Sequence, residues 1–166
     1  MKRNLNKYLG QCLAMCDECG IPYGEITNIV QDKADRRWGQ CRKRYGKFEI
    51  GISYKLIDEN WSKTDEGLIN TILHEVLHTC EGCLNHGNQW KYYADKIRNK
   101  YGIDITRTSS AEKKQVDLEK QLSLYKYVLR CKKCNMEIRR MRMTDVISQY
   151  SHYRCGKCNG ELERIK

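Results

Sequence analysis

The stretch HEVLHTCEGCLNH at residues 74–86 constrains the fold of this 166-residue chain more than any other feature. His74 and His78 are four residues apart, so on a helix both imidazoles project from one face and can reach one metal ion. Glu75 lies between them in the HExxH pattern, where a carboxylate can act as a general base. The pattern therefore predicts a zinc site built on a helix.

The apolar residues around this pattern agree with a helix over about residues 65–80, because they recur at spacings of three and four. Similar spacing predicts an N-terminal helix over residues 4–18 and a helix after the metal site over residues 88–101. Between the first two helices, runs rich in Ile, Val, Tyr, Phe and Trp alternate with turn residues. Three strands are expected there: ITNIV at 26–30, RWGQC at 37–41 and KFEIGISY at 47–54. The predicted fold class is α+β.

A catalytic zinc ion keeps three protein ligands and one open position, so the site needs a third ligand. Cys80 would lie roughly 240° around the helix from His74, on the core side. A Cys83 thiolate would make the zinc a weaker Lewis acid. His86 follows a loop long enough to return to the helix, and Gly87 after it permits close backbone approach. We predict three ligands to the catalytic zinc: His74, His78 and His86.

A second group of metal-binding residues lies near the C-terminus. Two CxxC pairs, separated by twenty residues, hold four cysteines: Cys131, Cys134, Cys155 and Cys158. This spacing is typical of a zinc ribbon, and four thiolates leave no open position, so the zinc predicted there is structural. It would stabilise a unit too small to do so through its core. Strands are expected at residues 125–130, 136–143 and 161–166.

The charge is distributed unevenly along the chain. Residues 1–106 hold 16 Lys or Arg and 14 Asp or Glu, whereas residues 123–166 hold 11 and 4, a net charge of +7. We predict a catalytic domain over 1–106, a polar linker over 107–122 and the zinc ribbon over 123–166. A basic unit favours a polyanionic partner such as nucleic acid, although a merely solvated charged surface is the alternative.

Basic and aromatic residues alternate in the ribbon, as they do in proteins that bind single-stranded nucleic acid. The candidate contacts are Arg130, Lys132, Lys133, Arg139, Arg140 and Arg142. Small zinc ribbons also use basic and aromatic residues to bind proteins. A protein partner is therefore the alternative to nucleic acid. The basic segment QCRKRYGK at residues 40–47 is a second candidate contact, or is cationic only for solubility.

The string HEVLHTCEGCLNHGNQW resembles the SprT-like zinc metalloprotease family. In that family HExxH is followed by a His-Gly pair and by an aromatic residue that opens the next helix, here His86, Gly87 and Trp90. RWGQC resembles a strand motif of the same family, and the resemblance covers about residues 5–106. It implies a zincin-like catalytic domain, to which the family often appends a C-terminal zinc ribbon. One departure is that Cys80 and Cys83 lie in the loop before His86.

The resemblance implies a zinc metallopeptidase with one catalytic and one structural zinc, in which Glu75 takes a proton from a water activated at the zinc. Its substrates would be proteins bound or crosslinked to DNA, as in DNA repair, and single-stranded DNA would be the preferred nucleic-acid partner. We expect a monomer without membrane association. Two alternatives stay open: a zinc hydrolase of a non-peptide substrate, and a non-catalytic nucleic-acid-binding adaptor. Three residues are candidates for a hydrogen-bond donor that stabilises the oxyanion, and the sequence does not distinguish among them: Asn88, Tyr92 and Tyr93.

The ten cysteines indicate a reducing compartment, because no export signal precedes them. No run of about 18 apolar residues exists either, so the predicted location is the cytoplasm. Cys12 and Cys16 lie on the apolar side of the first helix, where Cys often acts as a small buried hydrophobe. The roles of Cys19, Cys41, Cys80 and Cys83 are not determined. A third zinc held by Cys16, Cys19, Cys80 and Cys83 is conceivable.

Overall fold

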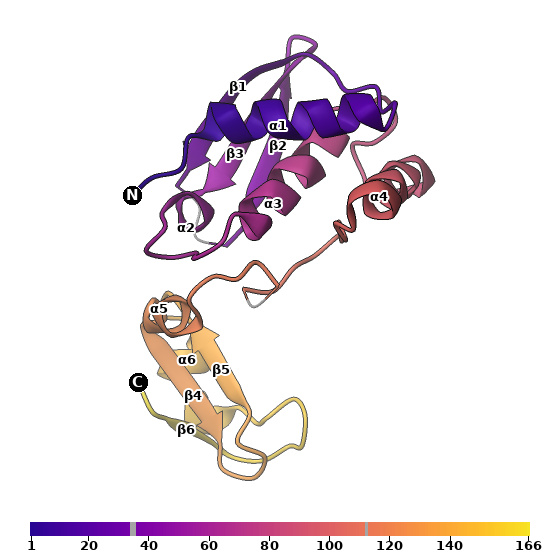
Figure 1. Cartoon of the computed structure of the whole chain (residues 1–166). Helices are drawn as coiled ribbons and strands as arrows, with labels where there is room; N and C mark the ends of the chain where they lie inside the picture. The colour runs from indigo at the N-terminus through magenta and orange to yellow at the C-terminus, as the bar shows by residue number, and fades with distance from the viewer. Residues whose placement is uncertain (34–35, 112) are drawn as a thin grey trace. The chain divides into compact units, whose positions relative to one another are not determined.

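The structure is a computed structural model that describes residues 1–33, 36–111 and 113–166. It divides into two compact units, Met1–Asp117 and Leu118–Lys166 (Figure 1). No helix among the described residues is both long enough and apolar enough to cross a membrane.

The first unit is built around a three-stranded sheet of β1 (Ile26–Asp32), β2 (Gly39–Arg44) and β3 (Lys47–Ser53). The strand order is β1-β3-β2, with β1 parallel and β2 antiparallel to β3. The central strand β3 is buried over most of its length, as its Ile-rich sequence requires. The three predicted strands are therefore present, and β2 is an edge strand.

Four helices complete this unit: α1 (Leu5–Glu18), α2 (Tyr54–Ile57), α3 (Glu66–Leu77) and α4 (Asn88–Tyr101). α3 packs against α1, β2 and β3, and its apolar side is part of one continuous core (Figure 1). The mixed helix and strand content confirms the α+β class. α3 ends at Leu77, three residues before the predicted end at residue 80, with His78 as its C-cap.

The N-terminal residues are held against the start of α3 by Arg3, whose side chain is 3% exposed. Its guanidinium donates hydrogen bonds to the backbone carbonyls of Leu56, Ser62 and Thr64 and forms an ion pair with Asp65. One buried side chain thus satisfies one carbonyl of α2 and two carbonyls of the segment that precedes α3.

Replacing Arg3 by Met is expected to lower the free energy of unfolding by about 2–3 kcal/mol, because the buried carbonyls lose their donor. Urea unfolding of the full chain measures this change. Lys2→Met is the matched control, since Lys2 is exposed and its ammonium makes only a long 3.4 Å contact with Gln31. Equal stability of the two variants would contradict the anchoring role of Arg3.

Residues 107–117 belong to the first unit, although the sequence predicted a linker over 107–122. Val116 forms a β-bridge with Ser62, and the backbone N–H of Asp117 donates to the carbonyl of Trp61 at 2.7 Å. Lys114 and Val116 are 4% and 5% exposed. The unit therefore ends at Asp117 and not at residue 106. The sequence of this segment shows no apolar periodicity, because its buried residues are one Lys and one Val that contact residues far away in the sequence.

The second unit contains α5 (Leu118–Ser123), β4 (Tyr127–Cys131), β5 (Glu137–Arg140), α6 (Asp145–Ser148), a 3-10 turn (Tyr150–His152) and β6 (Leu162–Arg164). The strand order is β5-β4-β6, and both outer strands are antiparallel to β4. Each predicted strand is present but shorter than predicted, and α6 was not predicted. The fully buried core is small and includes two cysteines: Leu129, Cys131, Ile147, Cys155 and Leu162.

Candidate metal centres

The fold brings three histidines together in the first unit. His74 lies on α3, His78 caps it one turn later, and His86 comes from the loop before α4. The Nε2 atom of His74 is 3.2 Å from that of His78 and 3.0 Å from that of His86. One ligand atom from each lies within 4.8 Å of the others, and no fourth His, Cys, Asp or Glu of the described residues joins this group.

Backbone carbonyls orient two of these imidazoles. His74 Nδ1 is 3.1 Å from the carbonyl oxygen of Thr106, and His78 Nδ1 is 2.7 Å from that of Cys83. A carbonyl oxygen only accepts, so each Nδ1 carries the proton and each Nε2 keeps a free lone pair. Burial, and then the neighbouring His78 and His86, lower the pKa of His74 to about 3. The His74 imidazole is thus held neutral, as metal ligation requires.

This donor set fits a zinc ion. Three imidazole nitrogens that converge on one point, with no fourth His, Cys, Asp or Glu ligand among the described residues, match a four-coordinate site with one open position. Trp90 packs beside all three rings, with its own ring centroid 5.0, 5.9 and 4.7 Å from those of His74, His78 and His86. It is 2% exposed, so it shields one side of the histidine cluster from water.

Glu75 lies beside the cluster and is 6% exposed. Burial raises the pKa of its carboxyl group to about 7, against the opposing effects of a hydrogen bond from the Cys41 backbone and of the charges of Lys114 and Arg37. A carboxylate whose pKa is near neutral is suited to take up and release a proton. The geometry thus places a potential base next to the three histidines.

Gly39 explains why the RWGQC strand can lie against Glu75. A Cβ atom on Gly39 would be 2.6 Å from the Oε1 atom of Glu75 and 2.8 Å from the Cγ2 atom of Thr71. Contacts this short do not occur, so any other residue would push β2 away from α3. In the sequence, RWGQC stood out only through its resemblance to a family motif. The structure explains why the motif needs a glycine.

We expect Gly39→Ala to shift the carboxylate of Glu75, so that any hydrolytic activity of this site falls at least about tenfold, and to destabilise the fold by about 1–3 kcal/mol. Steady-state rates and thermal unfolding measure the two effects. Gly10→Ala is the control, since a Cβ on Gly10 has no heavy atom within 4 Å. It should keep the rate and slightly raise stability, because Ala is the better helix former. Full activity of Gly39→Ala would contradict the contact.

A pocket of about 300 Å³ opens beside His74 and Glu75. The other residues that line it are Arg36, Arg37, Trp38, Gly39, Thr71, Thr106, Arg107, Thr108, Ser109 and Lys114. Sequence reasoning missed Thr106, Arg107 and Lys114, because they lie at or beyond the end of the predicted domain. No sequence signal identified them: Thr106 binds His74 through its backbone, and Lys114 appeared to belong to a polar linker.

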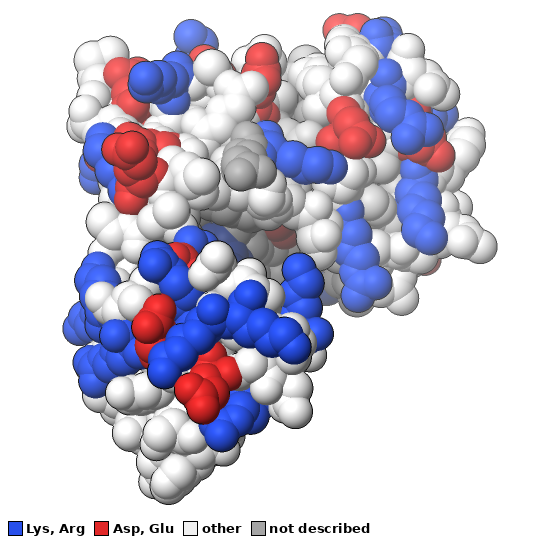
Figure 2. Space-filling model, turned by 90° about the horizontal axis from the view of Figure 1, so that it is seen from below, with Lys and Arg blue, Asp and Glu red and all other residues white. Residues whose placement is uncertain are grey.

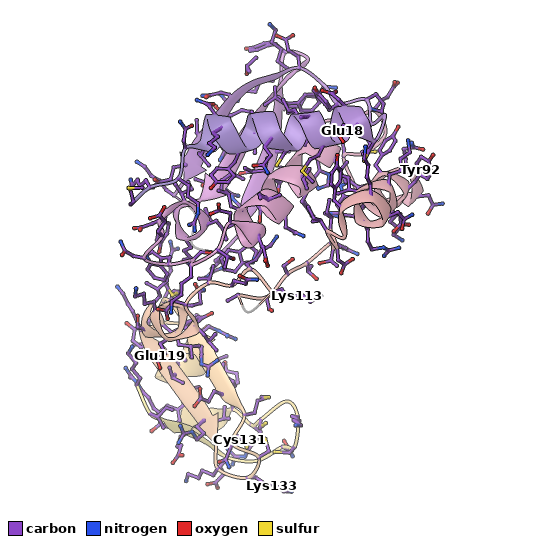
Figure 3. The ribbon with its side chains drawn as sticks, viewed as in Figure 1. Glu18, Tyr92, Lys113, Glu119, Cys131 and Lys133 are labelled. Atoms are coloured by element: carbon purple, nitrogen blue, oxygen red, sulfur yellow. The ribbon has the colours of Figure 1, made fainter. Side chains whose placement is uncertain are left out.

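The three side chains considered as oxyanion donors do not line this pocket. Tyr92 is 54% exposed, and Figure 3 shows it on α4, directed away from α3. Its ring instead lies under the ammonium of Lys96, 5.4 Å from the ring centroid. Tyr93 and Asn88 are also absent from the pocket wall.

The cysteines of the loop are core residues. Cys80 and Cys83 are 3% and 0% exposed and pack in the same core as Cys12 and Cys16. Burial raises the pKa of Cys80 to about 12, which keeps its thiol protonated. The two metal-binding groups found among the described residues include neither cysteine, so the conceivable third zinc site is not formed. Cys83 contributes instead through its backbone carbonyl, which binds His78.

The second unit brings its four cysteines together as the CxxC spacing predicted. The Sγ atoms of Cys131 and Cys158 are 3.5 Å apart, and those of Cys134 and Cys155 are 3.6 Å apart. All four lie within 4.8 Å of one another. Four thiols in this arrangement fit a tetrahedral zinc ion and are compatible with a zinc ribbon.

The candidate nucleic-acid contacts fall into two sets. Arg130 and Arg139 both pair with Glu137, and Lys132 pairs with Glu161. The remaining three candidates are exposed and make no ion pair with any residue that the structure describes: Lys133, Arg140 and Arg142. Figure 2 shows Lys and Arg side chains, with Asp and Glu among them, on the face that it presents.

The basic hairpin at residues 40–47 has internal partners as well. Arg42 pairs with Glu49 at 3.1 Å, and Lys47 pairs with Glu25 at 2.7 Å. The ammonium of Lys43 lies 5.4 Å from the centroid of the Phe48 ring. Much of the positive charge of this hairpin is thus paired with residues of the first unit.

Comparison with known proteins agrees with the geometry. The sequence model of the SprT-like family matches residues 8–110, which include all three histidines and Glu75. The protein SprT of Vibrio atlanticus (strain LGP32) is 29% identical over 163 residues, covering 92% of this chain and 87% of that protein.

Proposed function

The chain belongs to the SprT-like family, and from this premise we propose that it is a zinc-dependent metallopeptidase that hydrolyses proteins associated with DNA. The observation that carries the proposal is the convergence of His74, His78 and His86 beside the buried carboxylate of Glu75. Three histidine ligands without any other feature would be equally compatible with a structural metal ion. The adjacent base and the 300 Å³ pocket favour catalysis.

Each residue of the site has a distinct role in this proposal. His74, His78 and His86 would hold the zinc, which when bound lowers the pKa of water and polarises a carbonyl. Glu75 accepts a proton from the attacking water and passes it to the leaving amine. The carbonyls of Thr106 and Cys83 fix the ring orientations of His74 and His78.

The second unit would bring the peptidase to nucleic acid. Its cysteine cluster holds the strands together, and its net charge of +7 from residues 123–166 favours phosphate binding. Lys133, Arg140 and Arg142 are the strongest candidates of the six, because Arg130, Lys132 and Arg139 are already paired with Glu137 or Glu161. Affinity that falls steeply with salt would support this role.

Cleavage of a DNA-binding protein, with and without single-stranded DNA, tests the proposal. Wild type should cleave in the presence of DNA, and Glu75→Gln should not. Cleavage at the same rate with and without DNA would contradict the recruitment role of the second unit. It would not contradict the peptidase function.

The same assay distinguishes two other functions. A zinc-loaded chain that cleaves no protein would favour a hydrolase of a non-peptide substrate. A Glu75→Gln variant with full biological activity would favour a nucleic-acid-binding adaptor.

A further inference from the structure

The pocket beside the histidines is strongly cationic. Besides Glu75, every charged residue that lines it among those described is a cation: Arg36, Arg37, Arg107 and Lys114. Arg37 is neutralised in part by Asp32, whose Oδ2 atom is 2.7 Å from the Arg37 Nε atom. The positive charges of Arg107 and Lys114 exceed what Glu75 alone can balance.

Lys114 is an unusual residue in this wall because it is 4% exposed. Its ammonium donates a 2.6 Å hydrogen bond to the amide oxygen of Asn70, which carries no charge. Burial lowers the pKa of Lys114 to about 8, and the charge of Glu75 opposes this effect only in part. A buried ammonium held by a neutral amide is suited to bind an additional anion.

The position of the pocket limits what that anion can be. Glu75 lines the same pocket, so in the proposed peptidase the scissile carbonyl must lie nearby. Lys114 lines this pocket too, so a carboxylate on a side chain of the same peptide would enter the space that Lys114 borders. A phosphodiester carries a nucleoside on each side and would have to enter a 300 Å³ pocket that the peptide already occupies.

We propose that Lys114 and Arg107 select substrates that carry an Asp or Glu side chain next to the cleaved peptide bond. This inference rests on the proposed peptidase function and names a substrate preference for the same site. Lys114 contacts the acidic side chain directly, and the more exposed Arg107 adds charge at the pocket wall. Charge complementarity of this kind discriminates between substrates because the Gln or Asn analogue adds no negative charge to balance the buried ammonium.

Paired peptides that differ only in Glu or Gln test the preference at each position beside the cleaved bond. For the zinc-loaded wild type we expect kcat/KM to be about 10- to 100-fold higher with Glu at one position. Lys114→Met should reduce this ratio to below about threefold. Arg107→Gln, at an exposed residue, should lower the ratio in part.

Lys113→Met is the matched control. Lys113 is the exposed neighbour of Lys114 (Figure 3), and it lines a different pocket together with Glu66, Asn70 and Asp104. It should keep the full Glu preference. If Lys114→Met does not fold, as thermal unfolding would show, Arg107→Gln and the binding measurement below decide the outcome.

Binding is measured separately from catalysis in the Glu75→Gln background. The Glu peptide should bind about tenfold more tightly than the Gln peptide, and added Lys114→Met should remove the difference. Wild type that cleaves both peptides equally overturns this inference and leaves the peptidase proposal standing. Wild type that cleaves neither overturns the peptidase proposal. Displacement of the Glu peptide by oligothymidylate, lost in Lys114→Met, would assign the pocket to phosphate and overturn the inference.

Discussion

Glu75→Gln is expected to lower kcat/KM for peptide hydrolysis by about 10³-fold or more, because the amide cannot accept the proton of the attacking water. The change keeps the shape of the side chain and leaves all three histidines in place. Zinc content and melting temperature should therefore match wild type. The amide can still accept the hydrogen bond that the Cys41 backbone donates to Glu75.

Three measurements on the same preparation separate catalysis from folding: the steady-state rate, the zinc content and the melting temperature. Thr79→Ser is a useful control, since Thr79 is buried near the same helix end but lines no part of the pocket. Its hydroxyl donates to the carbonyl of Val76, a bond that Ser can keep. Wild-type rates in Glu75→Gln would exclude Glu75 from the mechanism.

The second large effect is expected from replacing Cys131 and Cys134 together by Ser, which should unfold the second unit. Its buried core holds only five residues, two of them cysteines. Zinc binding to four thiolates contributes about 10 kcal/mol or more to folding in units of this kind. Without it the strands β4 to β6 have too little apolar surface to stay assembled.

The first unit should survive this change, because all three histidines and Glu75 lie within Met1–Asp117. The variant should bind one zinc in place of two, lose chemical-shift dispersion for residues 118–166, and lose salt-dependent DNA binding. Hydrolysis of a short peptide should stay within about threefold of wild type. Cys19→Ser is the control, since Cys19 belongs to neither metal-binding group. Dispersed spectra of the double variant would show that the second unit does not need its metal.

Much of the fold followed from patterns that are local in the sequence. The apolar spacing of α3 and the HExxH pattern together predicted a helix that presents His74 and His78 on one side, and the structure contains it. The two CxxC pairs predicted a four-cysteine cluster for the same reason, since short spacings constrain geometry directly. His86 was predicted from the loop length and Gly87, and it lies at the cluster.

The parts that were missed depend on contacts between residues far apart in sequence. Lys114 is buried through Asn70, and Val116 through Ser62, so neither shows a periodic pattern. The carbonyl of Thr106 binds His74 through the backbone, which side-chain reasoning does not detect. Thr106 and Lys114 line the pocket, so the sequence predicted the clustering of the candidate metal ligands better than it predicted the pocket wall.

Restoration of zinc to the metal-free chain tests the central claim most directly. The chain is stripped with a chelator, zinc is added back in steps, and cleavage of a DNA-binding protein is followed together with bound zinc. We expect no cleavage by the metal-free chain and full cleavage once two zinc ions are bound per chain. Cleavage that survives complete zinc removal, or no cleavage of protein or peptide at two bound zinc ions, would contradict it.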